Sequence, residues 1–303
     1  MIRHLAHIEI DKDRWDSALL RCPQRRWYMQ AWVLDLCCPE WEALEDDSSR
    51  AIMPLLWRRK WGVDYLYQPY GTQQQGMFAP DPSSIDHVAF LRSVPKRFRY
   101  WDINLNAGID LQAETNDHLT QQVNQELLLD ADIAALRAGY SQGHRRNLRR
   151  CGDHPPVLSR DIGSEEFIEL FQRTTAARFG GVSTGDLLLL SRFLVEGTAR
   201  GQCRLLGMRS EGRLIAAACF MEWKGGLLLL KSANTDAGTD RQAMFHLVDA
   251  FIQDHAGTGE LLDLGGSNTA SVARFNAGFG ARSTVYLRLV RNLLPPPLRW
   301  LKR

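Results

Sequence analysis

A glycine pair between an apolar run and a short helical segment is the first stretch that could serve a ligand. In residues 261–281, "LLDLGGSNTASVARFNAGFGA", the run ends in Asp263 and the segment carries Arg274 and Asn276. The apolar residues of that segment share one helical face and are expected to pack. Neither Arg274 nor Asn276 is needed for that packing. The stretch therefore predicts a tight turn after a strand, with these two polar residues as candidate substrate contacts.

A second polar stretch, residues 232–244, predicts the end of a strand, a loop with Gly238, and the start of a helix. The N-terminus of a helix suits a phosphate or pyrophosphate, because backbone N–H groups and the positive end of the dipole point outward. Arg241 lies in the first turn, where a cation is unfavourable for the dipole. We interpret Arg241 as a candidate phosphate contact, although a solvated loop with a surface arginine explains the pattern equally well.

Residues 137–151 hold five arginines and His144 and no acidic residue. Because guanidinium groups pair well with phosphate, Arg145, Arg146 and Arg149 are candidates to bind an anionic ligand or partner. A solvated basic face is the alternative.

An uncharged stretch, residues 65–78, is rich in aromatic and amide side chains. Gln68, Tyr70 and Gln73 would suit hydrogen bonds to a neutral polar substrate. The alternative is an irregular loop without a ligand.

Bulk properties narrow the class of protein. The net charge of +2 does not require a nucleic-acid partner. The six cysteines show neither C-x-x-C nor zinc-finger spacing, so we expect reduced thiols and no metal site. The first fifteen residues lack the apolar core of a signal peptide, and no uncharged apolar stretch is long enough for a bilayer. These features indicate a cytoplasmic protein.

The predicted elements recur in two halves of an α/β (α+β) chain. Each half has two helices, three strands, a helix and a buried strand with an acidic residue, at an offset of about 160 residues. In the second half, hairpin turns are expected at Glu211–Gly212 and Gly225–Gly226, and one helix is expected over residues 239–257 with a capping box. We expect domains at residues 1–150 and 151–303.

This order of elements resembles a GNAT acyltransferase domain. "DLGGSN…ARFNAGFGA" with "YS…HRRNLRRC" resembles the Fem-type peptidyltransferases and their tandem-GNAT relatives. The resemblance implies two GNAT-like domains in tandem, each a mixed central sheet flanked by helices. It also implies acyl-CoA, for example acetyl-CoA, as the donor, and a small-molecule or peptide amine as the acceptor.

The same resemblance assigns the donor to the second half. The arm of the donor would lie against the backbone of Ser232, Ala233 and Asn234. The pyrophosphate would lie at the following loop and helix, whose residues are Gly238, Arg241, Gln242 and Ala243.

Attack of an amine on a thioester needs a base for the ammonium and an acid for the leaving group. Tyr286 is the candidate acid and Asp263 the candidate base. The chain departs from the Fem-type pattern, because Asn276 replaces a lysine and no long helical hairpin is present. Aminoacyl-tRNA is therefore less favoured than acyl-CoA, and a non-catalytic binding module is the third alternative.

Overall fold

The computed structural model describes residues 1–109, 111–112, 117–150, 156–178 and 180–295. The chain forms two compact units. The first comprises Met1–Val123 with Val285–Arg303, and the second comprises Asn124–Thr284. Residues 124–150 belong to the second unit, and most of the last strand belongs to the first. The division at residue 150 stays a prediction about the boundary of two repeats.

The first unit contains two sheets. One has the order β1-β2-β3, and the other contains β4, β5, β6, β13 and β7 in that order. Its strands are β1 (Ile2–Leu5), β2 (Glu42–Asp46), β3 (Ala51–Leu55), β4 (Trp57–Lys60), β5 (Val63–Tyr67) and β6 (Phe98–Asn104). Its α-helices are α1 (Lys12–Leu20), α2 (Ala31–Cys37) and α3 (His87–Ser93). Short 3₁₀ turns lie at η1 (His7–Glu9), η2 (Trp27–Met29) and η3 (Pro82–Ser84). Only Leu56 separates β3 from β4, yet the two strands belong to different sheets.

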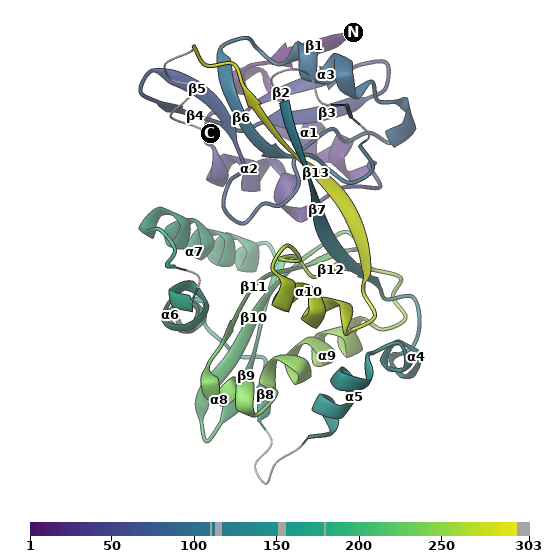
Figure 1. The fold of residues 1–303 in the computed structure, drawn as a ribbon, viewed down its shortest axis with the longest axis vertical. Coiled ribbons are helices and arrows are strands. Elements are labelled where there is room, and N and C mark those ends of the chain that lie inside the picture. Colours follow the sequence, from purple (N-terminus) through teal and green to yellow (C-terminus); the bar gives the residue numbers. More distant parts are fainter. Residues whose placement is uncertain (110, 113–116, 151–155, 179, 296–303) are drawn as a thin grey trace. The chain divides into compact units, whose positions relative to one another are not determined.

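The second unit is a mixed sheet of order β7-β12-β11-β10-β9-β8 with helices on its faces (Figure 1). Its strands are β8 (Val157–Ser159), β9 (Cys203–Ser210), β10 (Arg213–Trp223), β11 (Gly226–Asn234) and β12 (Leu261–Asp263). Its helices are α4 (Ile133–Ala138), α5 (Gln142–Arg149), α6 (Ser164–Phe171), the π helix η4 (Gln172–Ala176), α7 (Thr184–Ala199), α8 (Asp236–Asp240), α9 (Ala243–His255) and α10 (Ala270–Ala277).

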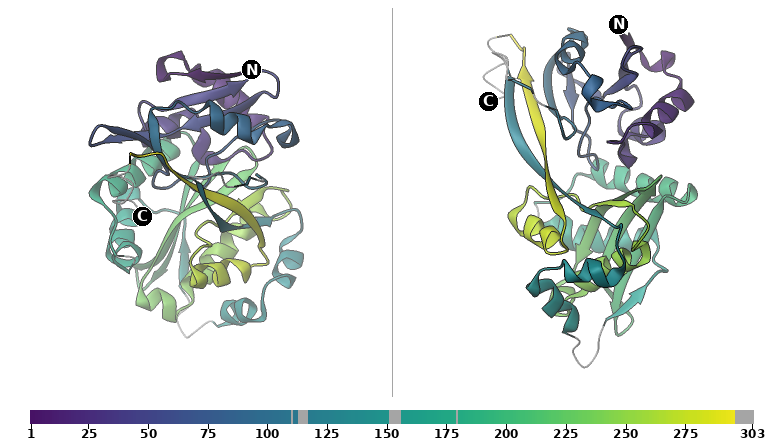
Figure 2. Two further views of the ribbon diagram at one scale, coloured as in Figure 1. Left: turned by 45° about the horizontal axis from the view of Figure 1, so that its top comes forward. Right: turned by 90° about the vertical axis from the view of Figure 1, so that its right-hand side faces the viewer.

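Two long strands belong to both units. In β7 (Asp117–Leu128) and in β13 (Arg282–Asn292), one end lies in each unit. The two strands run side by side (Figure 2). In the first unit β13 pairs antiparallel with β6, from Arg288 opposite Asn104 to Asn292 opposite Tyr100. In the second unit β7 pairs with β12. Each unit therefore completes its sheet with a strand from elsewhere in the chain.

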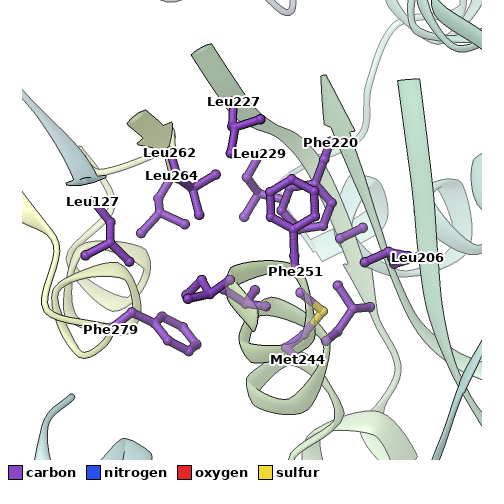
Figure 3. Close-up of a cluster of buried hydrophobic side chains, with 14 of the residues drawn as sticks. Leu127, Leu206, Phe220, Leu227, Leu229, Met244, Phe251, Leu262, Leu264 and Phe279 are labelled. Atoms are coloured by element: carbon purple, nitrogen blue, oxygen red, sulfur yellow. The ribbon is translucent and has the colours of Figure 1, made fainter. Parts of the chain in front are cut away.

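The core of the second unit lies between the sheet and α9 (Figure 3). Four apolar residues at helical spacing on α9, Met244, Val248, Phe251 and Ile252, are all buried. The rings of Phe251 and Phe220 stack with centroids 3.7 Å apart. Burial of large side chains of this kind stabilises the fold by about 1.5–3 kcal/mol each. The core thus fixes α9, and with it the loop before α9, against the sheet.

Two local expectations were wrong. The helix expected over residues 239–257 is interrupted, since α8 ends at Asp240 and α9 begins at Ala243. The turn between β10 and β11 is Lys224–Gly225, one residue before the expected position.

Candidate functional site

Strands β11 and β12 pair over only a short stretch. Their parallel register runs from Gly226 opposite Leu261 to Leu228 opposite Asp263. Beyond this point β11 continues to Asn234, while the N–H of Leu264 donates to Gln125 on β7. Within the part of the chain that the structure describes, residues 229–234 of β11 therefore have no register partner on β12. Backbone groups along this edge therefore need partners other than β12.

The glycine pair turns the chain away from β11. Gly265 and Gly266 have φ of 56° and 61°, a region that favours glycine. Asp263 Oδ1 accepts a hydrogen bond of 2.9 Å from the N–H of Gly265. Asn276 is 1% exposed, and its Nδ2 donates to the carbonyl of Gly265 at 2.8 Å. Asp263 and Asn276 therefore both stabilise the turn.

Arg274 lies on the same helix as Asn276 but is exposed. The two side chains therefore do not contact the same ligand surface, because Asn276 is buried and Arg274 faces solvent. Asn276 is fully explained by the turn that it holds.

The end of β11 is held by side chains around it. The hydroxyl of Thr175, in the π helix, donates to the carbonyl of Ser232 at 2.9 Å. Ala233 is buried opposite Ala217 of β10. Asn234 Nδ2 donates to the hydroxyl of Thr239 at 3.1 Å. Ser232, Ala233 and Asn234 thus form one rigid edge.

Two helices, α8 and α9, begin in succession after β11, where a single helix was expected. Thr235 caps α8 by accepting from the N–H of Gly238. Gln242 has φ of 55° and makes no side-chain cap for α9. An uncapped start leaves the first N–H groups of a helix without intrahelical partners. This start, at Ala243, is the feature of the loop that best suits a phosphate.

Two residues of this loop that were expected to contact the acyl donor, Gly238 and Ala243, serve packing. A Cβ on Gly238 would lie 2.4 Å from the carbonyl oxygen of Ile215, so glycine is required by the protein itself. Ala243 is completely buried in the core. Arg241 is half-buried and lies 4.0 Å from a carboxylate oxygen of Glu211. Ligand contacts at Gly238 and Ala243 would therefore be made by their backbone alone.

The loop after β5 in the first unit is tied to the end of β6. Gln68 Oε1 accepts from the N–H of Asn104 at 2.9 Å, and Asn104 Nδ2 donates to the carbonyl of Gln73 at 2.8 Å. Tyr70 is half-buried. Gln68 and Gln73 thus both hydrogen-bond to Asn104, and these bonds hold the loop after β5 against the end of β6.

The basic stretch divides into buried and exposed residues. Arg137 forms two hydrogen bonds with the carboxylate of Asp249 on α9, at 2.9 and 2.6 Å. His144 is buried, with Nε2 donating to the carbonyl of Phe275 at 2.9 Å and Nδ1 3.0 Å from the hydroxyl of Ser141. Burial lowers the pKa of the His144 imidazole.

The remaining arginines of this stretch lie on α5 or directly after it and are exposed. They are Arg145, Arg146, Arg149 and Arg150. Arg145 donates to the carbonyl of Ala138 at 2.7 Å. Arg145, Arg146 and Arg149 therefore form an exposed basic group on α5.

The two candidate catalytic residues belong to different units. Asp263 is buried at the end of β12 in the second unit, and Tyr286 is 3% exposed on β13 in the first. Directly opposite Asp263 on β7 stands Glu126. Two carboxylates in facing positions repel each other unless something else stabilises them.

Sequence analysis did not single out Glu126, Thr175 or Lys231. Glu126 and Thr175 gain their importance from pairing across long sequence separations, which no local pattern shows. Lys231 lies on β11 opposite Cys219, and burial lowers the pKa of its amine. An isolated lysine after the apolar run "GGLLLL" was its only signal.

Among the described residues, no group of three His, Cys, Asp or Glu side chains could hold a metal ion. Cys22, Cys37, Cys38, Cys203 and Cys219 are free thiols. Cys151 lies outside the described residues.

No model of a known protein family matches the sequence, and a search of curated proteins found no relative. Solved structures, in contrast, match it over nearly its whole length. FemX is 12% identical, with 99% of each chain covered and a TM-score of 0.69. A tandem GNAT protein from the clavulanic acid biosynthesis pathway is 11% identical, with 97% of this chain and 99% of that chain covered and a TM-score of 0.54.

The chain has a tandem GNAT-like fold related to that of Fem-type proteins. The mixed sheets flanked by helices confirm the expected fold class. A protein of unknown function from Bacteroides thetaiotaomicron has the same fold, with 8% identity, coverage of 93% and 96%, and a TM-score of 0.61. At these identities the similarity shows the fold alone.

Proposed function

We propose that this protein is an N-acyltransferase that transfers an acyl group from acyl-CoA to an amine acceptor, with the donor bound in the second unit. The observation that carries the proposal is the divergence of β11 from β12 after Leu228. It leaves residues 229–234 of β11 without a partner on β12, and the uncapped start of α9 follows the end of this strand after residues 235–242, at Ala243. An elongated ligand with an amide-bearing arm and a phosphate end matches that combination.

In this proposal the arm lies along Ser232, Ala233 and Asn234 and hydrogen-bonds to their backbone. The phosphates lie at the loop of Gly238, Arg241, Gln242 and Ala243. The loop supplies N–H groups at the start of α9, and Arg241 supplies a positive charge. Thr175 acts as a positioning residue, because its hydroxyl fixes the carbonyl of Ser232.

The reaction forms a C–N bond and breaks the C–S bond of the thioester. The acceptor ammonium must first lose a proton, and the departing thiolate must gain one. We assign the base to Asp263, whose Oδ1 holds Gly265, with Glu126 opposite it as a second carboxylate. We assign the acid to Tyr286.

The acceptor is proposed to be a small-molecule or peptide amine. Gln68, Tyr70 and Gln73 would contact its neutral polar groups. Arg274 and the α5 arginines, Arg145 and Arg146, are exposed and would contact any anionic group. The expected contact from Asn276 is left out, because its amide already bonds within the turn.

A second candidate function is transfer of an aminoacyl group from tRNA. The similarity to FemX over the whole chain and the exposed arginines of α5 favour it. The third candidate is a non-catalytic module that binds through the same arginines.

Isothermal titration distinguishes the three. Acetyl-CoA is titrated into the full-length protein, and aminoacyl-tRNA is titrated in parallel. Saturable binding of acetyl-CoA, weakened by Thr175→Val, supports the proposal. Binding of aminoacyl-tRNA but not of acetyl-CoA assigns the chain to the second candidate. If neither donor binds, the chain is not an acyltransferase of either kind.

A further inference from the structure

The hairpin of β4 and β5 ends in an unusual two-residue turn. Lys60 pairs with Val63, and the turn residues Trp61 and Gly62 have φ of 53° and 75°. Positive φ at both positions defines a type I′ turn, whose first residue is preferably Asn, Asp or Gly. A bulky side chain in this left-handed region is an outlier that suggests a function.

Other hairpins of the chain show that the turn itself does not need tryptophan. The β9–β10 turn is Glu211–Gly212 and the β10–β11 turn is Lys224–Gly225, and all four residues have positive φ. Their first positions hold charged residues, which favour solvent. Only Trp61, among these turns, places a large apolar ring there, and the residue is 83% exposed.

Cationic side chains lie on β4, before the Trp61 turn, and on the segment before β6. Arg58, Arg59 and Lys60 on β4 are exposed, and Lys60 Nζ lies 4.7 Å from the centroid of the Trp61 ring. Lys96 is exposed and precedes β6, whose parallel pairing with β5 starts at Asp64 opposite Phe98, next to the turn.

Two carboxylates near the hairpin are paired with arginines. Asp64 of β5 pairs with Arg59 at 2.5 Å, and Glu42 of β2, in the other sheet, pairs with Arg97. Glu40 is exposed beside Trp57 and Arg58. Arg58, Lys60 and Lys96 therefore leave a positive balance on β4 and on the segment before β6, with Lys60 against the exposed ring. We call residues 58–62 the Trp61 hairpin; β4 is an edge strand of its sheet (Figure 1).

We propose that the Trp61 hairpin docks the protein onto the surface of an anionic phospholipid bilayer. A ring at the outermost turn with cations set back along the strand matches the order of layers at a membrane. Tryptophan favours the boundary of headgroups and acyl chains, and Lys and Arg favour the phosphates. Single-stranded RNA would also accept an aromatic ring and cations, but its bases stack along a groove rather than on one protruding ring.

Such docking would be peripheral. No helix among the described residues has the length and apolar character needed to cross a bilayer. One ring and a few cations give reversible binding, which salt weakens. The inference does not depend on the proposed transferase activity.

Vesicle co-sedimentation of the full-length protein tests the inference. Vesicles contain either phosphatidylcholine alone or phosphatidylcholine with one quarter phosphatidylglycerol. We expect binding to the anionic vesicles only. Trp61→Asn removes the ring but installs Asn-Gly, which a type I′ turn prefers. It should weaken binding about ten-fold while the melting temperature holds or rises. Lys60→Gln and Lys96→Gln should each weaken binding about five-fold.

Ile8→Asn is the matched control, because Ile8 is a 94% exposed apolar residue of the same unit. Its binding should equal that of the unmodified protein. Equal loss in Ile8→Asn and Trp61→Asn, full binding by Trp61→Asn, or no preference for anionic vesicles would each overturn the inference. Binding of a twenty-nucleotide single-stranded RNA that depends on Trp61, without vesicle binding, would assign the hairpin to nucleic acid instead.

Discussion

Replacement of Gln242 by glutamate should weaken donor binding without weakening the fold. Gln242 stands at the start of α9 and makes no cap, and its Nε2 donates to the carbonyl of Thr239 in an exposed bond of 2.9 Å. A carboxylate there lies about 5 Å from a phosphate at the helix start. Repulsion at that distance is about 0.8 kcal/mol in water and about 3.3 kcal/mol at an effective dielectric constant of 20.

Because Gln242 is only half-buried and its side-chain bond to Thr239 is open to solvent, the lower half of this range applies, about 1–2 kcal/mol. Affinity for acetyl-CoA should then fall about 5- to 30-fold, and the loss should shrink in high salt. The stability of the fold should change little, since a negative charge near a helix N-terminus is favourable by about 0.3–1 kcal/mol and offsets the loss of the exposed bond from Nε2 to Thr239. Isothermal titration at two salt concentrations and thermal melts measure both effects.

Gln253→Glu supplies the matched control. It makes the same change of charge on the same helix, about 16 Å further along the axis, and keeps an acceptor for Arg137. Donor affinity should be unaffected. Unchanged affinity in Gln242→Glu, or an equal loss in both variants, would refute the placement of the phosphates. Gly238 and Ala243 are poorer positions to test, because substitution there disturbs packing.

Three further predictions concern the second unit. Reversal of charge at Arg145 and Arg146 should weaken binding of tRNA and lower the slope of log affinity against log salt by about 2; an unchanged slope would make these arginines a solvated face. The fold should lose stability as pH falls below about 6.5, because burial lowers the pKa of His144 in the folded state and the unfolded chain binds the proton first. Thermal melts from pH 8 to 5 should show a weaker pH dependence of the melting temperature in His144→Gln than in the unmodified protein. His246→Gln is measured beside it, because burial lowers the pKa of His246 too. Asn276→Ala should cost about 1–3 kcal/mol of unfolding free energy, measured by urea titration, since the half-buried carbonyl of Gly265 loses its donor; a loss of substrate affinity at constant stability would assign Asn276 to the substrate.

Local patterns predicted the elements that local chemistry determines. The strands β9 to β11 follow from apolar runs separated by glycine-containing turns, and the buried face of α9 follows from helical spacing. The glycine pair was expected as a turn, and Gly265 and Gly266 do form one. These features depend on neighbours within a few residues, which the sequence shows directly.

Features that depend on distant partners were not predictable. Arg137 and Arg145 stand in the same basic stretch, yet one pairs with Asp249 and the other faces solvent. The difference comes from a partner 112 residues away in the sequence, which a pattern of charges does not reveal. The start of α9 also escaped prediction, because Thr239 and Gln242 have the capping-box spacing but the chain adopts a left-handed conformation at Gln242. The placement of β7 and β13 in both units is likewise a product of long-range pairing.

The position of β13 has a consequence for synthesis on the ribosome. Asp102 of β6 pairs with Arg288 of β13 across 186 residues of sequence. A chain that emerges at 5–20 residues per second needs on the order of ten to forty seconds to supply that strand. During this interval β6 has an open edge, which can pair with another nascent chain. The unit that is translated first is thus completed last, and chaperones that shield strand edges should raise the yield of folded protein.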